Sequence, residues 1–191
     1  MDYLLLKEKE IILNAANNEQ AFLELYEYYF PRVYNYVFAR VGEKGASEDI
    51  TSGVFEKIIA KISTYKPECG KFSTWLFTIT HNMVMDYFRK SKKDAFILVD
   101  QLEEESSDQP SIEELMILEE DKKNLLMCLS LLSDRDRNIV SLKFWSQLSN
   151  QEIAEIVNES SNHIAVILYR SIKRLKTLIL DQEAEEVRNA R

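Results

Sequence analysis

Residues 72–93 read FSTWLFTITHNMVMDYFRKSKK, and this stretch decides the fold because its side chains divide between two faces of one helix. One face repeats apolar residues at three- and four-residue steps, the spacing of a helix that packs on a core. Its members are Phe72, Trp75, Leu76, Ile79, Met83 and Phe88. A second side is mostly polar and ends in cations: Thr74, Thr78, Asn82, Met85, Arg89, Lys90, Lys92 and Lys93. Because such a face attracts a phosphate backbone, we predict that this helix binds nucleic acid.

The rest of the chain has the composition of an all-α protein. Its 191 residues include only four glycines and three prolines, and long apolar patterns of 3.6-residue period dominate it. Cys69 and Cys128, together with His81 and His163, match no disulfide or metal-ligand spacing. The apolar N-terminal run is interrupted by charges at residues 7–10, and no stretch is long enough to span a bilayer. We therefore predict a reduced, cytoplasmic protein without cofactor, metal or membrane insertion.

The net charge of −8 is unevenly distributed along the chain. Ten acidic residues and no lysine or arginine lie between Val99 and Asp121, and removing these ten charges from −8 leaves the remainder at +2. The acidity thus belongs to a flexible linker, because a segment rich in charge and poor in apolar residues cannot form a core. We predict two small helical domains at residues 20–95 and 122–180, an acidic linker at 96–121 and a C-terminal tail at 181–191.

The first domain is expected to contain three helices. The first covers roughly residues 20–41 and ends at the glycines of GEKGAS. Ser47 is the expected N-cap of the second helix, since Glu48 and Asp49 then lie in its first turn, where the helix dipole favours acids. A loop at residues 65–71 leads into the helix quoted above.

The second domain has the pattern of a helix-turn-helix. Helices are expected at residues 113–132, 134–145, 150–157 and 161–179, with Ser133 and Ser149 as N-caps and Glu152 completing a capping box. Asn158 tolerates the left-handed conformation that the turn needs. The last helix has a basic second half, formed by Arg170, Lys173, Arg174 and Lys176. A short helix, a tight turn and a basic helix are typical of a DNA-reading unit.

Five motifs in this order resemble regions two and four of bacterial RNA polymerase sigma factors of the extracytoplasmic-function group. They are SEDIxxxVF (47–55), FxxWLxxIxxNxxxDxxR (72–89), LxxRDRxIVxLKF (132–144), SxQEIAEI (149–156) and LxRSxKRL (168–175). The resemblance covers about residues 22–93 and 125–176. It implies a protein that binds core RNA polymerase, reads the −35 element with its helix-turn-helix and melts the −10 element with region two.

The resemblance also implies roles for individual residues. Contacts to the polymerase β′ clamp helices would come from Glu48, Asp49, Ser52, Phe55 and Glu56, and region four would meet the β flap. Contacts near the −10 element would come from Lys71, Phe72, Asn82, Arg89, Lys90, Lys92 and Lys93. The loop 69–72 and Asn82 would hold an unstacked base. Phe72 would form the aromatic wall beside that base, and Asn82 would bond to its polar edge. Contacts of the helix-turn-helix would come from Ser161, Asn162, His163, Val166, Ile167, Arg170, Lys173 and Arg174.

The recognition helix departs from the family pattern. Residues 164–168 are apolar where basic or hydroxyl residues are usual, and we expect Val166 and Ile167 to face outward, where they can touch thymine methyls only. Glu159 places a charge near the DNA. We therefore hypothesise −35 reading that is weak, AT-biased or assisted by a separate DNA-targeting protein, and an anti-sigma factor is a further possible partner. Two alternatives stay open, a helix-turn-helix regulator that acts without polymerase and a sigma-like adaptor. No catalytic constellation is present, so we predict that the chain is not an enzyme.

Overall fold

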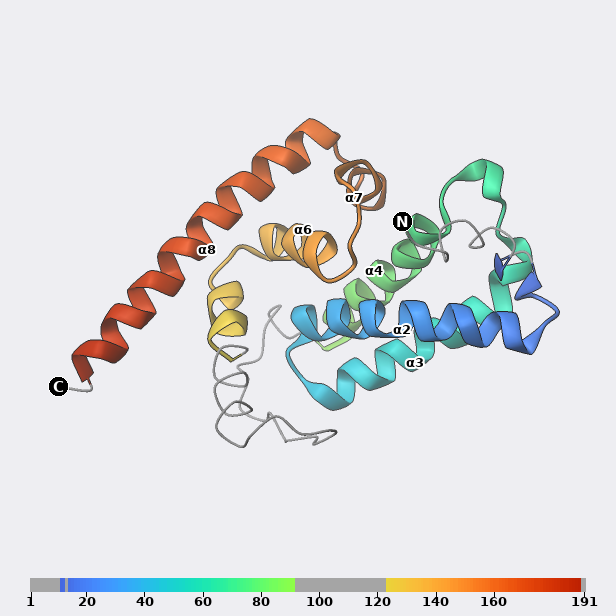
Figure 1. The fold of residues 1–191 in the computed structure, drawn as a ribbon, viewed down its shortest axis with the longest axis horizontal. Coiled ribbons are helices and arrows are strands. Elements are labelled where there is room, and N and C mark those ends of the chain that lie inside the picture. The colour runs from blue at the N-terminus through green and yellow to red at the C-terminus, as the bar shows by residue number, and fades with distance from the viewer. Residues whose placement is uncertain (1–10, 13, 92–122, 190–191) are drawn as a thin grey trace.

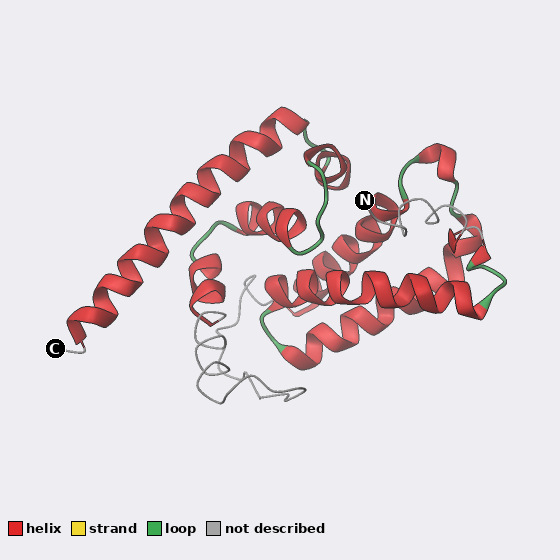
Figure 2. Ribbon diagram, in the orientation of Figure 1, coloured by secondary structure: helices red, strands yellow, loops and turns green. Residues whose placement is uncertain are grey.

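The computed structural model describes residues 11–12, 14–91 and 123–189, and its regular elements within these ranges are all helical (Figure 2). The α-helices are α2 (Glu19–Val41), α3 (Lys44–Lys61), α4 (Phe72–Ser91), α6 (Asp134–Phe144), α7 (Asn150–Val157) and α8 (Ser161–Asn189). Two 3₁₀ turns, η1 (Ile62–Thr64) and η2 (Pro67–Cys69), lie in the loop before α4, and residues 123–130 are also helical. The predicted all-α fold is confirmed.

The first unit is a three-helix core in which α2 and α3 lie side by side and α4 packs against both (Figure 1). Val33, Val54, Ile58 and Leu76 are completely buried where the three helices meet. Phe77 is also completely buried, and its ring meets the Tyr36 ring edge-on at 6.0 Å. The periodic apolar residues of each helix thus converge on one core, which fixes the polar side of α4 toward the surface.

The start of α3 differs from the prediction. Gly42 ends α2 in a left-handed conformation (φ 75°), and α3 then begins at Lys44 with Glu43 as its N-cap. The Glu43 carboxylate accepts a hydrogen bond from the Ala46 amide at 3.1 Å. Ser47 is therefore inside the helix, fully buried, and its hydroxyl donates to the Glu43 carbonyl at 2.6 Å. The predicted Ser47 cap is wrong because the helix begins four residues earlier, where the Glu43 side chain accepts from a free amide of the first turn.

The second unit follows its local signals closely. Ser133 caps α6, and Ser149 with Glu152 forms the capping box of α7. Asn158 adopts the left-handed conformation, with φ 54° and ψ 53°, between α7 and α8. The last helix is longer than predicted: α8 continues through residue 179 to Asn189 as a single rod (Figure 1), and Gln182 near its end contacts Cys128 at 2.9 Å. Residues 113–122 of the predicted helix 113–132, and the whole predicted linker at 96–121, lie outside the described residues.

The two units contact one another directly. Helix α6 packs on α2, and α7 packs on α4 near its N-terminal end. The contacts include polar groups: the Arg40 guanidinium donates to Asp134 at 2.7 Å, and the Tyr36 hydroxyl donates to Asn138 at 2.8 Å. Inter-domain surfaces of this polar kind are typical of domains that also separate.

Candidate nucleic-acid interface

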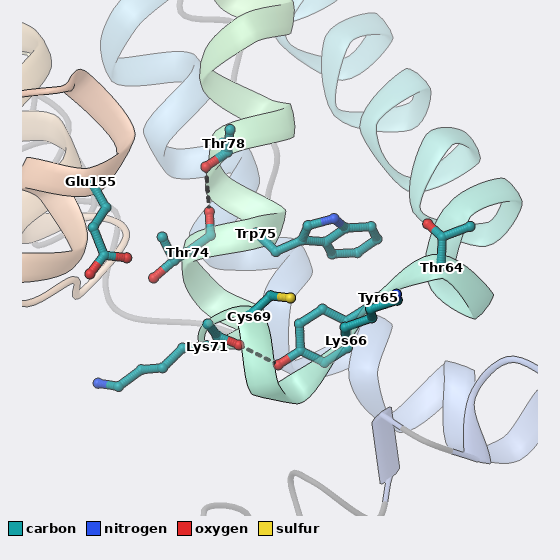
Figure 3. Close-up of a pocket in the computed structure, with 10 residues that line it drawn as sticks. Thr64, Tyr65, Lys66, Cys69, Lys71, Thr74, Trp75, Thr78 and Glu155 are labelled. Carbon is teal, nitrogen blue, oxygen red and sulfur yellow. Dashed lines mark hydrogen bonds between the residues drawn. The ribbon is translucent and has the colours of Figure 1, made fainter.

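A pocket of about 270 Å³ lies where the loop before α4 meets the first turns of that helix (Figure 3). Tyr65 and Trp75 form an aromatic wall, with their ring centroids 5.5 Å apart. The Tyr65 hydroxyl donates to the Gly70 carbonyl at 2.9 Å, which holds the loop against the helix. Lys66 and Lys71 also line the pocket. An aromatic wall beside cations matches the needs of an unstacked base and its phosphates.

The polar side of the pocket comes from two threonines one helical turn apart. The Thr78 hydroxyl donates to the Thr74 carbonyl at 2.7 Å (Figure 3). The Thr74 hydroxyl oxygen is buried and has no hydrogen-bond partner among the described residues. A buried polar atom without a partner costs free energy, so a ligand that reached this hydroxyl after the groups covering it moved would satisfy it.

The structure separates the predicted −10 residues into different environments. Phe72 is 2% exposed, and its ring packs against Tyr29 at 5.4 Å, so direct base contact by Phe72 is contradicted. Phe72 is buried because it opens the apolar stripe of α4. Asn82 is exposed and does not line the pocket. Lys71 lies at the pocket, whereas Arg89 and Lys90 are exposed at the far end of α4, where Arg89 pairs with Asp86 at 2.8 Å. Lys92 and Lys93 lie outside the described residues.

Sequence reasoning missed the residues that build this pocket. The spacing of Trp75 predicts a core residue, and Trp75 does pack against the core, but its half-buried side chain also lines the pocket, which the spacing does not predict. Thr74 belongs to the polar side of α4, and the sequence pattern predicts no specific function for it. The signal that could have found them is the loop before α4, since its Pro67 and Gly70 turn the chain so that Tyr65 faces Trp75.

Helix α3 presents the predicted polymerase-binding face with one correction. Glu48, Asp49, Ser52 and Glu56 are exposed, but Phe55 is 4% exposed and belongs to the core, where it contacts Tyr26 at 4.7 Å. Ile59 is 59% exposed and was not predicted. It follows Glu48, Ser52 and Glu56 at helical spacing, so these four side chains share one face.

The start of α8 presents most of the predicted −35 residues. Ser161, Asn162, His163, Arg170, Lys173 and Arg174 are exposed, and Val166 is 45% exposed. Ile167 is only 8% exposed, so the prediction that it faces DNA is wrong. It lies three residues after Ile164 and directly before Leu168, which places all three on the buried face of α8.

The charge of Glu159 is neutralised by neighbours that the sequence alone did not connect. Its carboxylate bonds Arg135 of α6 and lies 3.0 Å from Nδ1 of His163. The helix-turn-helix therefore carries a local charge cluster at its turn, in which Glu159 holds a cation that DNA would otherwise attract.

Replacing Glu159 by glutamine should strengthen duplex DNA binding a fewfold, because it frees Arg135 from an exposed pair worth about 1 kcal/mol or less. The slope of log affinity against log salt concentration should become steeper by about 0.9, the value for one additional phosphate contact. Titrations of duplex DNA at several salt concentrations measure both quantities, with Asp181→Asn, exposed farther along α8, as a control for total charge. Weaker binding by Glu159→Gln would show instead that the carboxylate positions Arg135.

His81 is part of a buried network rather than the surface residue that its type suggests. Its Nδ1 lies 3.1 Å from the Tyr36 hydroxyl, which also donates to Asn138 of the second unit. Burial lowers the pKa of His81, the nearby Arg40 lowers it further, and Asn138 and Asp134 only partly oppose this. His81 is therefore neutral in the folded chain at physiological pH.

This network predicts a pH dependence of stability. The pKa of His81 is lower in the folded than in the unfolded chain, so its contribution is fully present above the unfolded value of about 6.5 and is lost as the pH falls below it. The thermal unfolding temperature should decrease from pH 7.5 to pH 5.5. The size of the decrease should match the protonation of a single histidine in the unfolded chain. A His81→Gln variant, scanned by circular dichroism over the same range, should show a flatter profile. Glu152 does not interfere, because its lowered pKa places its titration below this window.

A second hollow lies between α6 and α8 and is apolar. Its volume is about 430 Å³, and its walls include Leu129, Val140, Phe144, Ile172 and Leu175. Phe144 is 55% exposed and Ile172 is 45% exposed, so this groove leaves large apolar side chains in solvent. Exposed apolar grooves of this kind mark protein-binding surfaces. Within the described part of the chain, no helix combines the length and apolar character needed to cross a membrane.

Comparison with known proteins connects these surfaces to one family. The family model for Sigma-70 region 2 matches residues 25–94, and that for Sigma-70 region 4 matches residues 122–175. The ECF RNA polymerase sigma factor BldN of Streptomyces coelicolor is 29% identical over 87% of this chain and 63% of its own length. The RNA polymerase sigma factor YlaC of Bacillus subtilis is 26% identical over 85% of this chain and 94% of its own.

Solved structures agree on the fold. CnrH, solved in complex with the cytosolic domain of CnrY, has a TM-score of 0.65 at 19% identity and covers 90% of this chain and 96% of its own. RpoE of Bartonella quintana, solved in complex with the anti-sigma factor NepR, has a TM-score of 0.65 at 20% identity and covers 83% and 96%. Both family regions, in the same order and on the same fold, are present here. The chain is therefore a sigma factor of the extracytoplasmic-function group and directs initiation of transcription by RNA polymerase at promoters.

Proposed function

We propose that the pocket before α4 captures an unstacked base of the −10 element, and that this capture stabilises the melted promoter. The observation that carries the proposal is the wall formed by Tyr65 and Trp75 beside the unpartnered Thr74 hydroxyl. A base inserted there stacks on an aromatic face, worth about 1–3 kcal/mol, and bonds one hydroxyl through its edge. Lys66 and Lys71 neutralise the adjacent phosphates, and Arg89 and Lys90 extend the contact along α4.

Polymerase binding is assigned to two surfaces. The exposed face of α3, centred on Ser52 and Ile59, supports the predicted contact with the β′ clamp helices. The apolar groove between α6 and α8 supports a contact with the β flap, since Phe144 and Ile172 offer apolar area there. Because its partner is the transcription machinery, we infer that the chain acts in the cytoplasm and has no catalytic activity of its own.

The −35 element is read by the start of α8 with limited base specificity. Ser161, Asn162 and His163 are exposed there, but Val166 occupies the next outward position and contacts thymine methyls only. Recognition of the −35 element is therefore weak or AT-biased, and a separate DNA-targeting protein would strengthen it. A footprint with tight, sequence-specific protection at −35 by polymerase and this protein alone would contradict this part. Because CnrH and RpoE were solved with partner proteins, RpoE with an anti-sigma factor, a partner of that kind is also proposed here.

Transcription by core polymerase with and without the protein tests the proposal. In the presence of the protein, defined start sites should appear. Trp75→Leu removes the stacking surface and should slow open-complex formation about fivefold or more, since stacking is worth about 1–3 kcal/mol. Permanganate reactivity of thymines near −10 measures the melting directly, and co-purification with core polymerase should remain unchanged.

Asn82→Ala serves as the matched control on the same helix. Asn82 is exposed outside the pocket, so its loss should affect melting much less than Trp75→Leu. An effect at Asn82 equal to that at Trp75 would place base capture further along α4. Absence of polymerase binding by the unmodified protein would favour a regulator or adaptor that acts without polymerase.

A further inference from the structure

The second unit covers the mouth of the pocket with acidic side chains. Glu155 of α7 lines the pocket opposite Thr74 and Thr78 (Figure 3). One turn earlier, Glu152 is 8% exposed and accepts a hydrogen bond from the Ser73 hydroxyl at 2.5 Å. Its carboxylate also lies 3.6 Å from Nζ of Lys71. Two carboxylates of the second unit are thus directed at the groups that would receive DNA.

These carboxylates resemble the anion that the pocket is built to bind. Lys71 and Ser73 are a cation and a hydroxyl donor at the start of a helix, a setting that favours phosphate oxygens. Burial raises the pKa of Glu152. Hydrogen bonds from Ser149 and Ser73 and the charge of Lys71 together lower it by more, so the pKa lies below its ordinary value. Glu152 is consequently an anion at neutral pH.

A second set of contacts fixes this arrangement away from the pocket. Arg40 is fully buried and pairs with Asp134 at 2.7 Å. Arg32 stacks over the ring of Tyr29 at 5.0 Å and donates to the Ser146 carbonyl at 3.2 Å. A buried guanidinium requires its partner, because an unpaired buried charge is strongly unfavourable. The side chain of Asp134 is 50% exposed even with the units docked, so Arg40 is the partner that depends on the pair.

We propose that α7 is an intramolecular competitor of promoter DNA: in the free chain, Glu152 and Glu155 close the pocket, and the units must separate before a base can enter. The inference rests on the proposed function of the pocket. It assigns the Asp134–Arg40 pair the role of a latch, since the pair stabilises only the docked state. Polymerase or DNA that binds the separated state therefore shifts the chain away from docking.

The first test measures the latch. Asp134→Ala should raise affinity for a short fluorescein-labelled single-stranded DNA of randomised sequence at least tenfold, as read by fluorescence anisotropy. Asp136→Ala, which removes the same charge from the same turn without an inter-domain pair, should bind like the unmodified chain. The gain should disappear in the double variant Asp134→Ala/Trp75→Leu. Equal binding by Asp134→Ala and the unmodified chain would overturn the inference. A gain that survives Trp75→Leu would instead overturn the proposed function of the pocket.

The second test detects the docked state itself. Cys69 is exposed and lines the same pocket as Glu155, so a short bis-maleimide should crosslink Cys69 to Glu155→Cys in a Cys128→Ala background. The crosslinked protein should lose single-stranded DNA binding, and Asp134→Ala should lower the crosslinking yield. Ala165→Cys, exposed on α8 and outside the pocket, is the negative control. No crosslink from residue 155, or undiminished DNA binding after crosslinking, would overturn the inference.

Discussion

Phe72→Ala is expected to lower the free energy of unfolding by about 3–5 kcal/mol, the cost of removing a buried phenylalanine from a packed core. The Phe72 ring contacts Tyr29, Tyr65 and Trp75, with centroids 5.4, 5.3 and 5.5 Å away. Its loss therefore disturbs both the three-helix core and the wall of the pocket. Polymerase binding and promoter melting should fail together, which distinguishes this residue from one that only contacts DNA.

Chemical denaturation of the intact protein, followed by circular dichroism, measures this effect. Phe72→Leu keeps most of the buried volume and should cost much less than the alanine variant. Asn82→Ala, on the exposed side of the same helix, should stay within about 0.5 kcal/mol of the unmodified chain. Normal stability of Phe72→Ala combined with a melting defect would restore Phe72 to the DNA-binding surface.

Ile59→Glu should weaken binding to core polymerase by about 2 kcal/mol, roughly thirtyfold in the dissociation constant. Ile59 is the large apolar side chain on the face that α3 also presents through Glu48, Ser52 and Glu56. An apolar anchor surrounded by polar residues is the usual centre of a protein interface. A buried glutamate without a partner is unfavourable at such a centre.

Competition for core polymerase against the labelled unmodified protein measures this loss. The matched control is Leu23→Glu on α2, since Leu23 is also apolar and 44% exposed but lies on another helix. Both variants should unfold at nearly the unmodified temperature. Equal loss at Leu23 and Ile59 would mean that exposed apolar area in general, rather than the α3 face, binds polymerase.

The sequence predicts the helices of this chain well because their signals are local. The N-cap of α6 and the capping box of α7 involve residues only three positions apart, so Ser133, Ser149 and Glu152 are recognisable without a structure. The choice between Glu43 and Ser47 as a cap is also local, but serine is a preferred N-cap residue and glutamate is not, so residue preference points to the wrong position. Ile167 was misplaced because it sits at the boundary between the buried and exposed faces of α8.

The candidate site is less predictable because it is assembled from distant segments. The pocket needs Tyr65 from a loop, Thr74 and Trp75 from α4, and Glu155 from the second unit. No spacing in the sequence relates Glu155 to Trp75. The same reason hides the network of Tyr36, His81 and Asn138, whose members come from three helices. Resemblance to a family locates the helix that carries the site, and the folded chain determines which side chains face it.

Glu152 divides its two carboxylate oxygens between different tasks. Oε2 accepts from the Ser149 amide at 3.0 Å and the Ser149 hydroxyl at 2.6 Å, which starts α7, and it also lies 3.6 Å from Nζ of Lys71. Oε1 accepts from the Ser73 hydroxyl. A substitution at position 152 therefore alters helix initiation and domain docking at once, and neither property can be adjusted there alone. Ser73 has no such constraint, since its hydroxyl takes no part in the cap. We therefore expect the strength of docking between the two units to be tuned at position 73. Loss of one hydroxyl there weakens docking and leaves the helix-turn-helix intact.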